Sequence, residues 1–145
     1  MNMDEFKKQL NQLMIIQIDT LSELLKLLEE QHFYIVKNDV FNMESIVEKI
    51  QVSNQKIANV ELKRRELTKD MLKDKTFGKL IQQLNDKELE NNFKNLRRLL
   101  EEIRLQKDTN ELLIKQGLSF TNKMLMLLNP DRQAKTYNGY GKIGR

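Results

Sequence analysis

The chain has 145 residues, a single-domain length, and its 25 lysines and arginines against 21 aspartates and glutamates give a net charge of +4. The two signs are interspersed, so the blocks of positive charge typical of nucleic-acid binding are missing and no nucleic-acid partner is expected. The absence of cysteine excludes disulfides and thiolate metal sites. No secretory signal or membrane-spanning stretch is recognisable, and we expect a cytoplasmic protein without membrane insertion.

A first long amphipathic helix is predicted over about residues 4–37. Its seam, the line of residues expected to face the neighbouring helices, advances in alternating steps of four and three. It consists of Met14, Ile18, Leu21, Leu25, Leu28, His32 and Ile35. Glu29 and His32 have the Glu-x-x-His spacing of di-iron helical bundles, but the chain contains one histidine and such a site needs two of these pairs. We therefore expect no metal, and we interpret His32 as an interface residue.

A second long helix is predicted over about residues 40–73. Asn38 and Asp39 precede it, and their short side chains suit a turn and accept hydrogen bonds from the first free amides of a helix. The seam of this helix is Met43, Ile46, Ile50, Ser53, Ile57, Val60, Arg64, Leu67 and Met71. Two polar residues, Ser53 and Arg64, interrupt it.

A short helix at 77–84 and a last long helix over about residues 86–128 complete the predicted elements. Asn85 and Glu88 match a capping box at the start of the long one. Its seam is Leu89, Phe93, Leu96, Leu100, Ile103, Lys107, Asn110, Ile114, Gly117, Thr121, Met124 and Leu128. We interpret Asn110 as a polar residue that fixes the register of the packed helices, with a direct role in partner binding as the alternative.

Long amphipathic helices joined by short turns pack antiparallel in sequence with small crossing angles. The predicted fold is therefore all-α, an elongated antiparallel bundle of three long helices with coiled-coil-like packing, one short extra helix and a C-terminal tail. The predicted domain division is a helical bundle at 1–129 and a flexible basic tail at 130–145.

The end of the last helix has more apolar surface than one seam can bury. Apolar residues between Leu89 and Ile103 span an arc of about 120° on a helical wheel, whereas those between Leu112 and Leu128 span about 180°. Either the 77–84 helix, the tail or a second copy covers this excess, or another protein docks there through an amphipathic helix. The candidate partner-binding residues are Leu112, Leu113, Ile114, Phe120, Met124, Leu127 and Leu128.

The closing stretch "NPDRQAKTYNGYGKIGR" differs from the rest of the chain. Pro130 ends the helix, and three glycines with Tyr137 and Tyr140 follow. Four basic residues against one acidic residue would support weak, salt-sensitive contact with phosphates, so a structural coiled-coil or nucleic-acid-associated protein is the alternative function. No nucleotide-binding, hydrolase or zinc-site motif occurs, and we expect neither an enzyme nor a cofactor.

The seam pattern, "NDVFNMESIVEKI" and above all "QKDTNELLIKQGLSFTNKMLMLLNPDRQAKTYNGYGKIG" resemble the FlgN family of flagellar type III export chaperones. In that family a long last helix carries an asparagine in its middle, ends in a leucine-rich turn and leads into a tail with a tyrosine followed by glycine. These features correspond here to Asn110, to Leu125, Leu127 and Leu128, and to Tyr137 with Gly139 or Gly141.

The resemblance implies a cytoplasmic, non-enzymatic chaperone of the hook-filament junction proteins. Such a chaperone binds the helical terminal segment of its client, prevents premature assembly and presents the client to the export apparatus. Carried onto this sequence, client contact falls on Leu112–Leu128 and docking to an export-gate component on Tyr137. Whether the free protein is a monomer or a homodimer stays open.

Overall fold

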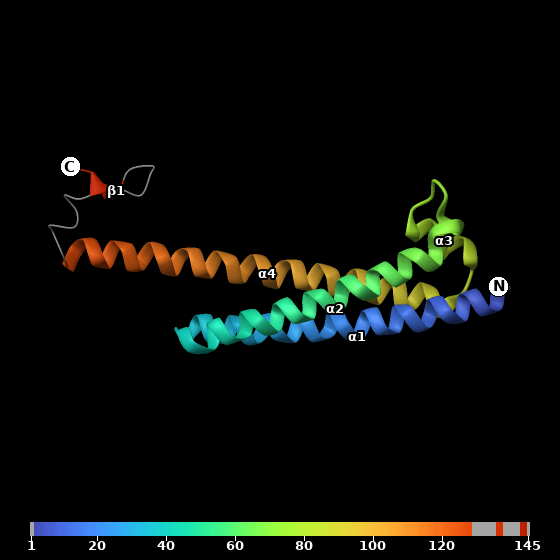
Figure 1. Cartoon of the computed structure of the whole chain (residues 1–145), viewed down its shortest axis with the longest axis horizontal. Helices are drawn as coiled ribbons and strands as arrows, with labels where there is room; N and C mark the ends of the chain where they lie inside the picture. Colours follow the sequence, from blue (N-terminus) through green and yellow to red (C-terminus); the bar gives the residue numbers. More distant parts are fainter. Residues whose placement is uncertain (1, 129–135, 138–142, 145) are drawn as a thin grey trace. The chain divides into compact units, whose positions relative to one another are not determined.

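The structure is a computed structural model that describes residues 2–128, 136–137 and 143–144. Within these residues the elements are α1 (Met3–Val36), α2 (Val40–Leu72), α3 (Phe77–Leu84), α4 (Lys87–Leu128), β1 (Thr136–Tyr137) and β2 (Ile143–Gly144) (Figure 1). The all-α class with three long helices and one short helix is confirmed. The two short strands, which the sequence did not indicate, pair antiparallel with Tyr137 opposite Ile143.

The contacts divide the chain into two compact units, Met1–Asn110 and Glu111–Arg145. The first unit contains α1, α2, α3 and α4 as far as Asn110, and the second contains the remainder of α4 and the strand pair. The division into a helical domain at 1–129 and a flexible tail at 130–145 stays a prediction. Residues 129–135, 138–142 and 145 of that tail lie outside the described residues.

Short polar side chains start each helix, because the first amides of a helix have no partner within it. Asn2, Asp39 and Thr76 cap α1, α2 and α3. At the start of α4 the side chain of Asp86 accepts from the amide of Leu89 at 3.0 Å, so the capping box expected at Asn85 is wrong. Asn85 instead ends α3 in the left-handed conformation, with φ of 51°, which asparagine tolerates better than most residues.

The direction of the helices in the first unit follows from side-chain contacts. Gln17 bonds Glu61, and Glu23 pairs with Lys56, so α1 and α2 are antiparallel. Between α1 and α4 the contacts advance together along both helices, from Asn11 with Asn92 to Leu28 with Asn110, so these two helices run parallel. Consecutive long helices therefore alternate in direction, as expected for an up-down-up bundle.

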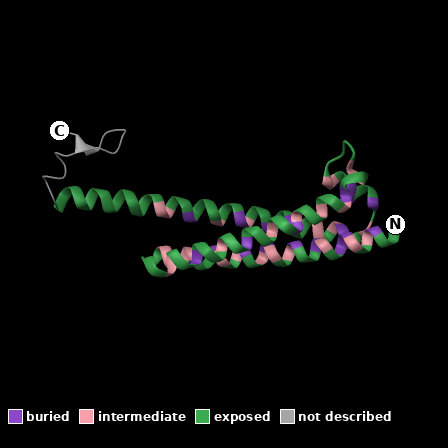
Figure 2. Cartoon of the chain, in the orientation of Figure 1, coloured by how far each residue is buried: buried purple, intermediate pink, exposed green. Residues whose placement is uncertain are grey.

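One apolar cluster lies between α1, α3 and α4 within the first unit. It consists of Phe6, Leu10, Met14, Leu21, Leu24, Leu28, Leu80, Ile81, Leu84, Leu89, Leu96, Leu99 and Ile103. Side chains of α2, among them Ile50 and Ile57, pack against this cluster from the side. The three buried side chains of α3 all belong to the cluster, so the apolar face of that short helix is occupied in the core of the first unit (Figure 2).

In the first unit the predicted seam residues mostly alternate between fully buried ones and half-buried ones that pack against the cluster, except Leu100 and Lys107, which are exposed. In α4 the buried residues step from Leu96 to Leu99 and Ile103, whereas the prediction placed Leu100 on the seam. In α1 Gln17 and Leu24 are buried beside the predicted Ile18 and Leu25, which are half-buried. Each helix in the first unit contacts two others, so its buried stripe is wider than a two-stranded seam.

Ser53 is a buried polar residue of α2, and we expect its hydroxyl to lower the free energy of unfolding. Its side chain is 2% exposed, and its Oγ has no hydrogen-bond partner among the described residues. A buried hydroxyl without a partner loses its hydration without compensation. We expect Ser53→Ala to raise the free energy of unfolding by up to about 1 kcal/mol in urea denaturation. A destabilised variant would show that the hydroxyl has a partner.

Candidate functional site

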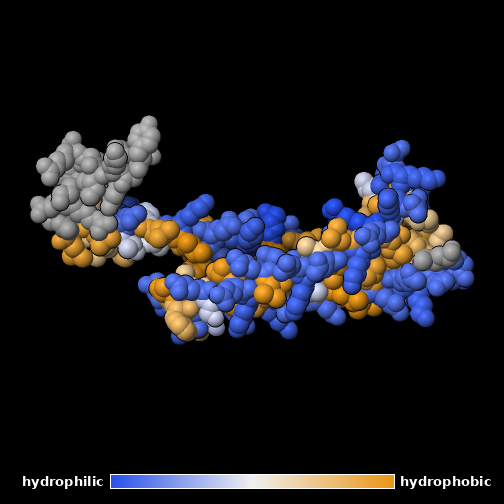
Figure 3. Space-filling view, in the orientation of Figure 1, coloured by the Kyte–Doolittle hydropathy of each residue, from blue (hydrophilic) through white to orange (hydrophobic). Residues whose placement is uncertain are grey.

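The end of α4, residues 112–128, exposes many apolar side chains. We call Leu112, Leu113, Ile114, Leu118, Phe120, Met124, Leu125, Leu127 and Leu128 the C-terminal α4 surface. Leu113 and Ile114 are half-buried, and the others are exposed, with the largest exposed fractions at Leu127 (72%) and Leu128 (75%). Apolar side chains gather over these turns in Figure 3. All seven residues predicted to bind a partner belong to this surface.

The C-terminal α4 surface has a regular geometry. Leu113, Phe120 and Leu127 recur every seven residues, so each lies about 20° from the one before on the helix circumference. Met124 and Leu128 lie within one turn of Leu127 on the adjoining side, and the five residues form one ridge along α4. Leu112 lies outside the ridge, roughly 100° from Leu113. An apolar ridge with this spacing matches the face through which helices pack side by side.

Gly117 lies within this surface, and it is a weak point of the helix. A Cβ added there would meet nothing within 4 Å. Glycine inside a helix costs roughly 0.5–1 kcal/mol relative to alanine, because it gives up more backbone freedom. The helix is therefore less stable at Gly117 than it would be with an alanine there.

Asn110 is buried at the last contact between α1 and α4 in the first unit. Its side chain is 2% exposed. Its Nδ2 donates to the carbonyl oxygen of Leu28 at 2.8 Å and to Oε1 of Gln31 at 2.9 Å, and its Oδ1 accepts from Gln106 at 3.0 Å. Every hydrogen-bonding atom of this amide thus has a partner when α1 and α4 pack in this register. That geometry fits a register residue, and its role in partner binding stays untested.

Gln106 extends the network to the single histidine. Its Nε2 also lies 3.2 Å from Nδ1 of His32, which is half-buried on α1. The seam prediction placed Lys107 at this level, and that placement is wrong because Lys107 is exposed. An amide can satisfy both Asn110 and His32 here, whereas a lysine would bring a charge into the interface.

Tyr137, predicted to dock to an export gate, lies in β1. Its backbone is paired with Ile143 of β2. The structure does not describe its side chain. The predicted docking role of Tyr137 therefore rests on the sequence.

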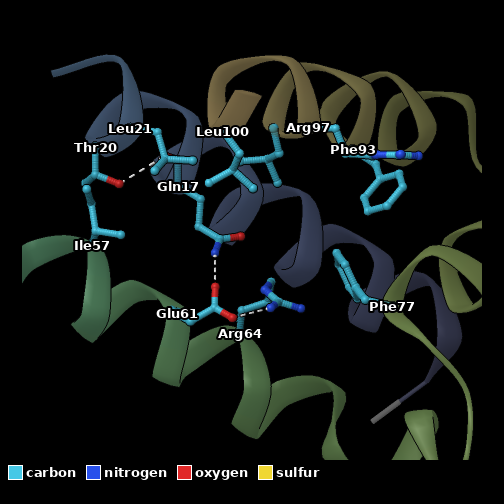
Figure 4. Close-up of a pocket in the computed structure, with 11 residues that line it drawn as sticks. Gln17, Thr20, Leu21, Ile57, Glu61, Arg64, Phe77, Phe93, Arg97 and Leu100 are labelled. Carbon is cyan, nitrogen blue, oxygen red and sulfur yellow. Dashed lines mark hydrogen bonds and ion pairs between the residues drawn. The ribbon is translucent and has the colours of Figure 1, made fainter. Parts of the chain in front are cut away.

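Two features were not found from the sequence. Phe33, Val36, Val40 and Phe41 flank the turn between α1 and α2, and all four are exposed. The signal was present, because apolar residues stand on both sides of the "KND" turn instead of polar ones. The second feature is a half-open pocket in the first unit beside Gln17 and Arg64 (Figure 4). No periodicity indicates it, because it depends on how several helices meet.

No group of three or more His, Asp or Glu side chains in the described residues is arranged to hold a metal ion. No helix in the described part of the chain combines the length and apolar character that crossing a membrane requires.

A family model described as FlgN protein matches residues 1–144. No curated protein matches the chain, and no solved structure matches it.

Proposed function

The chain belongs to the FlgN family of flagellar export chaperones, and on that basis we propose that it binds the helical terminal segments of hook-filament junction proteins. FlgN-family chaperones act in the cytoplasm, bind flagellar proteins and are not known as enzymes. In the proposed role this protein holds its client there, prevents premature assembly and delivers it to the flagellar type III export apparatus.

The exposed C-terminal α4 surface is the observation that carries this proposal. Exposed apolar patches of this kind are typical of sites that bind another protein. A ridge repeating every seven residues complements the apolar face of an amphipathic helix. A client segment that polymerises through its own apolar face would be kept from doing so while that face is buried against Leu113, Phe120 and Leu127.

The complex has to come apart again when the client is exported. A single helical ridge offers a smaller apolar interface than a permanent complex, which is consistent with release. The sequence contains no glycine-rich phosphate-binding loop, so the chain carries no recognisable nucleotide site to drive release. In the proposed cycle the export apparatus therefore supplies the energy for unloading.

Binding of a purified junction-protein terminal fragment, measured by calorimetry at low and high salt, tests the client assignment. We expect binding that changes little with salt, because apolar contacts are not screened. A parallel titration with single-stranded nucleic acid covers the alternative function, since binding to phosphates weakens steeply as salt rises. Nucleic-acid binding without fragment binding would overturn the proposal.

The second part of the proposal assigns docking at an export-gate component to Tyr137. We expect Tyr137→Ala to reduce secretion of junction proteins from cells while binding of the client fragment in vitro is unchanged. Tyr140→Ala is the matched control, because it removes the same ring three residues away. Equal loss of secretion in both variants would show that the tail acts through composition and not through Tyr137.

A further inference from the structure

The turn between α1 and α2 presents an apolar surface in the first unit that the proposed function does not use. We call Phe33, Val36, Val40 and Phe41 the hairpin-end surface, and their side chains are 55–80% exposed. Phe41, at 80%, is more exposed than Leu128 at the end of α4. Apolar side chains are visible at this end of the α1–α2 pair in Figure 3. Aromatic side chains are enriched where proteins bind one another, so this surface is a candidate interface.

Hydrogen bonds hold the turn beneath the hairpin-end surface. The amide of Asp39 donates to the carbonyl oxygen of Tyr34 at 2.9 Å, and the carboxylate of Asp39 accepts from the side-chain nitrogen of Asn42 at 2.6 Å. Asn38 has a left-handed backbone, with φ of 59°, so the chain reverses within three residues. A surface fixed in this way before binding loses little conformational freedom when a partner arrives.

On α1, two glutamates flank Phe33. Glu29 and Glu30 come one turn before it, about 40° to one side and 60° to the other side of its position on the helix circumference. Both are exposed, and neither carboxylate forms an ion pair with a residue that the structure describes. One turn after Phe33, Lys37 places its Nζ 5.1 Å from the centre of the phenyl ring. An ammonium group on the face of an exposed phenylalanine therefore suits this end of the hairpin.

On α2, two further glutamates accompany Phe41. Glu44 comes one turn after Val40 and Phe41 and lies between them on the helix circumference, and Glu48 comes two turns after Phe41, about 20° from it. Both are exposed, and within the described residues their carboxylates take part in no ion pair. The glutamates of α2 thus lie on the side of the helix from which Phe41 projects.

The glutamates of the two helices lie at the same end of the hairpin. The hydrogen bond from Gln17 to Glu61, drawn in Figure 4, shows which residues of the two antiparallel helices are level with each other. The same number of residues forward along α1 and back along α2 leads from this pair to Glu30 and Glu48. An acidic belt drawn from both helices therefore borders the hairpin-end surface.

The charge at this end is opposite in sign to that of the chain. Residues 29–49 contain five acidic residues against two basic ones, a net charge of −3, whereas the whole chain carries +4. Phosphate groups of a nucleic acid or of an anionic membrane would be repelled here. Two copies that met symmetrically through this surface would bring the same glutamates together. A partner that presents cations beside apolar side chains would meet opposite charge.

We propose that the hairpin-end surface binds an amphipathic segment of another protein in which lysines or arginines flank an apolar face. The apolar face covers Phe41 and Val40, and burial of these side chains provides most of the affinity. The cations pair with the acidic belt, which raises the rate of association and selects the partner by charge. The surface belongs to the first unit and the C-terminal α4 surface to the second, so this proposal does not depend on the client assignment.

The test compares two short amphipathic peptides with the same leucine face, one with lysines and the other with glutamates on the opposite face. Each is titrated into the full chain at low salt, and affinity is taken from the amide NMR shifts of Val36, Val40 and Phe41. We expect the lysine peptide to bind about tenfold more tightly. Equal affinity of the two peptides, or shifts from the lysine peptide confined to the C-terminal α4 surface, would overturn the proposal.

Charge reversal checks the acidic belt. The double variant Glu44→Lys, Glu48→Lys should bind the glutamate peptide more tightly than the lysine peptide. Glu66→Lys with Asp70→Lys is the matched control, because both residues are exposed and have the same spacing further along α2. The control should keep the preference of the parent for the lysine peptide. A reversed preference in the control would show that total charge decides, and it would contradict a specific surface.

Removal of the Phe41 ring checks the apolar part. Phe41→Ser should weaken the lysine peptide about tenfold, whereas Val52→Ser, at another exposed apolar residue of α2, should bind like the parent. Unchanged binding by Phe41→Ser would contradict the proposal. Sedimentation of the chain alone covers a second copy as the occupant. A dimer that dissociates in Phe41→Ser would assign the surface to self-association and overturn the proposal.

Discussion

Asn110→Asp should lower the free energy of unfolding by about 3–4 kcal/mol, although the substitution changes the side-chain volume very little. The new oxygen would face the carbonyl oxygen of Leu28 and Oε1 of Gln31, where the amide nitrogen now donates to both. Gln31 can turn its amide to donate, but the helix fixes the carbonyl of Leu28. A carboxylate that is almost entirely buried also loses its hydration.

Urea denaturation at neutral pH measures this loss, and Asn95→Asp is the matched control. Asn95 is an exposed asparagine of the same helix, so its variant adds the same charge and should stay within about 0.5 kcal/mol of the parent. The difference between Asn110→Asp and the parent should shrink in acid, when the new carboxyl is protonated. Similar losses in the two variants would show that the Asn110 network does not hold α1 and α4 in register.

Leu127→Asp and Leu113→Asp should each weaken binding of a junction-protein terminal fragment by about 10- to 100-fold. Both leucines lie on the heptad ridge of the C-terminal α4 surface, and an aspartate there would have to lose its hydration against the apolar face of the client. Leu127 is 72% exposed in the free protein, so its replacement should leave the free energy of unfolding almost unchanged.

Asn122→Asp is the control for added charge, because Asn122 is exposed and lies about 180° from Leu113 on the helix circumference, opposite the ridge. We expect this variant to bind the fragment like the parent. Full binding by both leucine variants would contradict the assignment of client binding to this surface. Loss of binding in Asn122→Asp as well would indicate a general effect of negative charge and not an apolar ridge.

The helices of the first unit were predictable because local chemistry determines them. Asp39 stands before an amphipathic stretch and caps α2 where the sequence indicates. The exposed C-terminal α4 surface was foreseeable for a related reason, since its apolar arc is wider than one seam uses. The residues assigned there stay predictions until binding is measured.

The remaining features depend on contacts between helices that no single helix encodes. Leu99 and Leu100 are both leucines, and only the positions of α1 and α3 determine which one is buried. In the same way, contacts with α1 determine that Gln106 is half-buried while Lys107 is exposed. The hydrogen bond from Gln17 to Glu61 likewise joins residues 44 positions apart. A pattern on one helix cannot report such arrangements.

The parallel pairing of α1 with α4 has a consequence for synthesis on the ribosome. The hydrogen bond between Leu28 and Asn110 joins residues 82 positions apart, and the one between Asn11 and Asn92 spans 81. α1 and α2 can pair as soon as they emerge, but the apolar cluster stays open until α4 has been made. Non-local contacts of this kind form late and leave apolar surface exposed meanwhile. The family to which this protein belongs protects other chains from early association. This protein is itself most prone to aggregate while its last helix is still being synthesised.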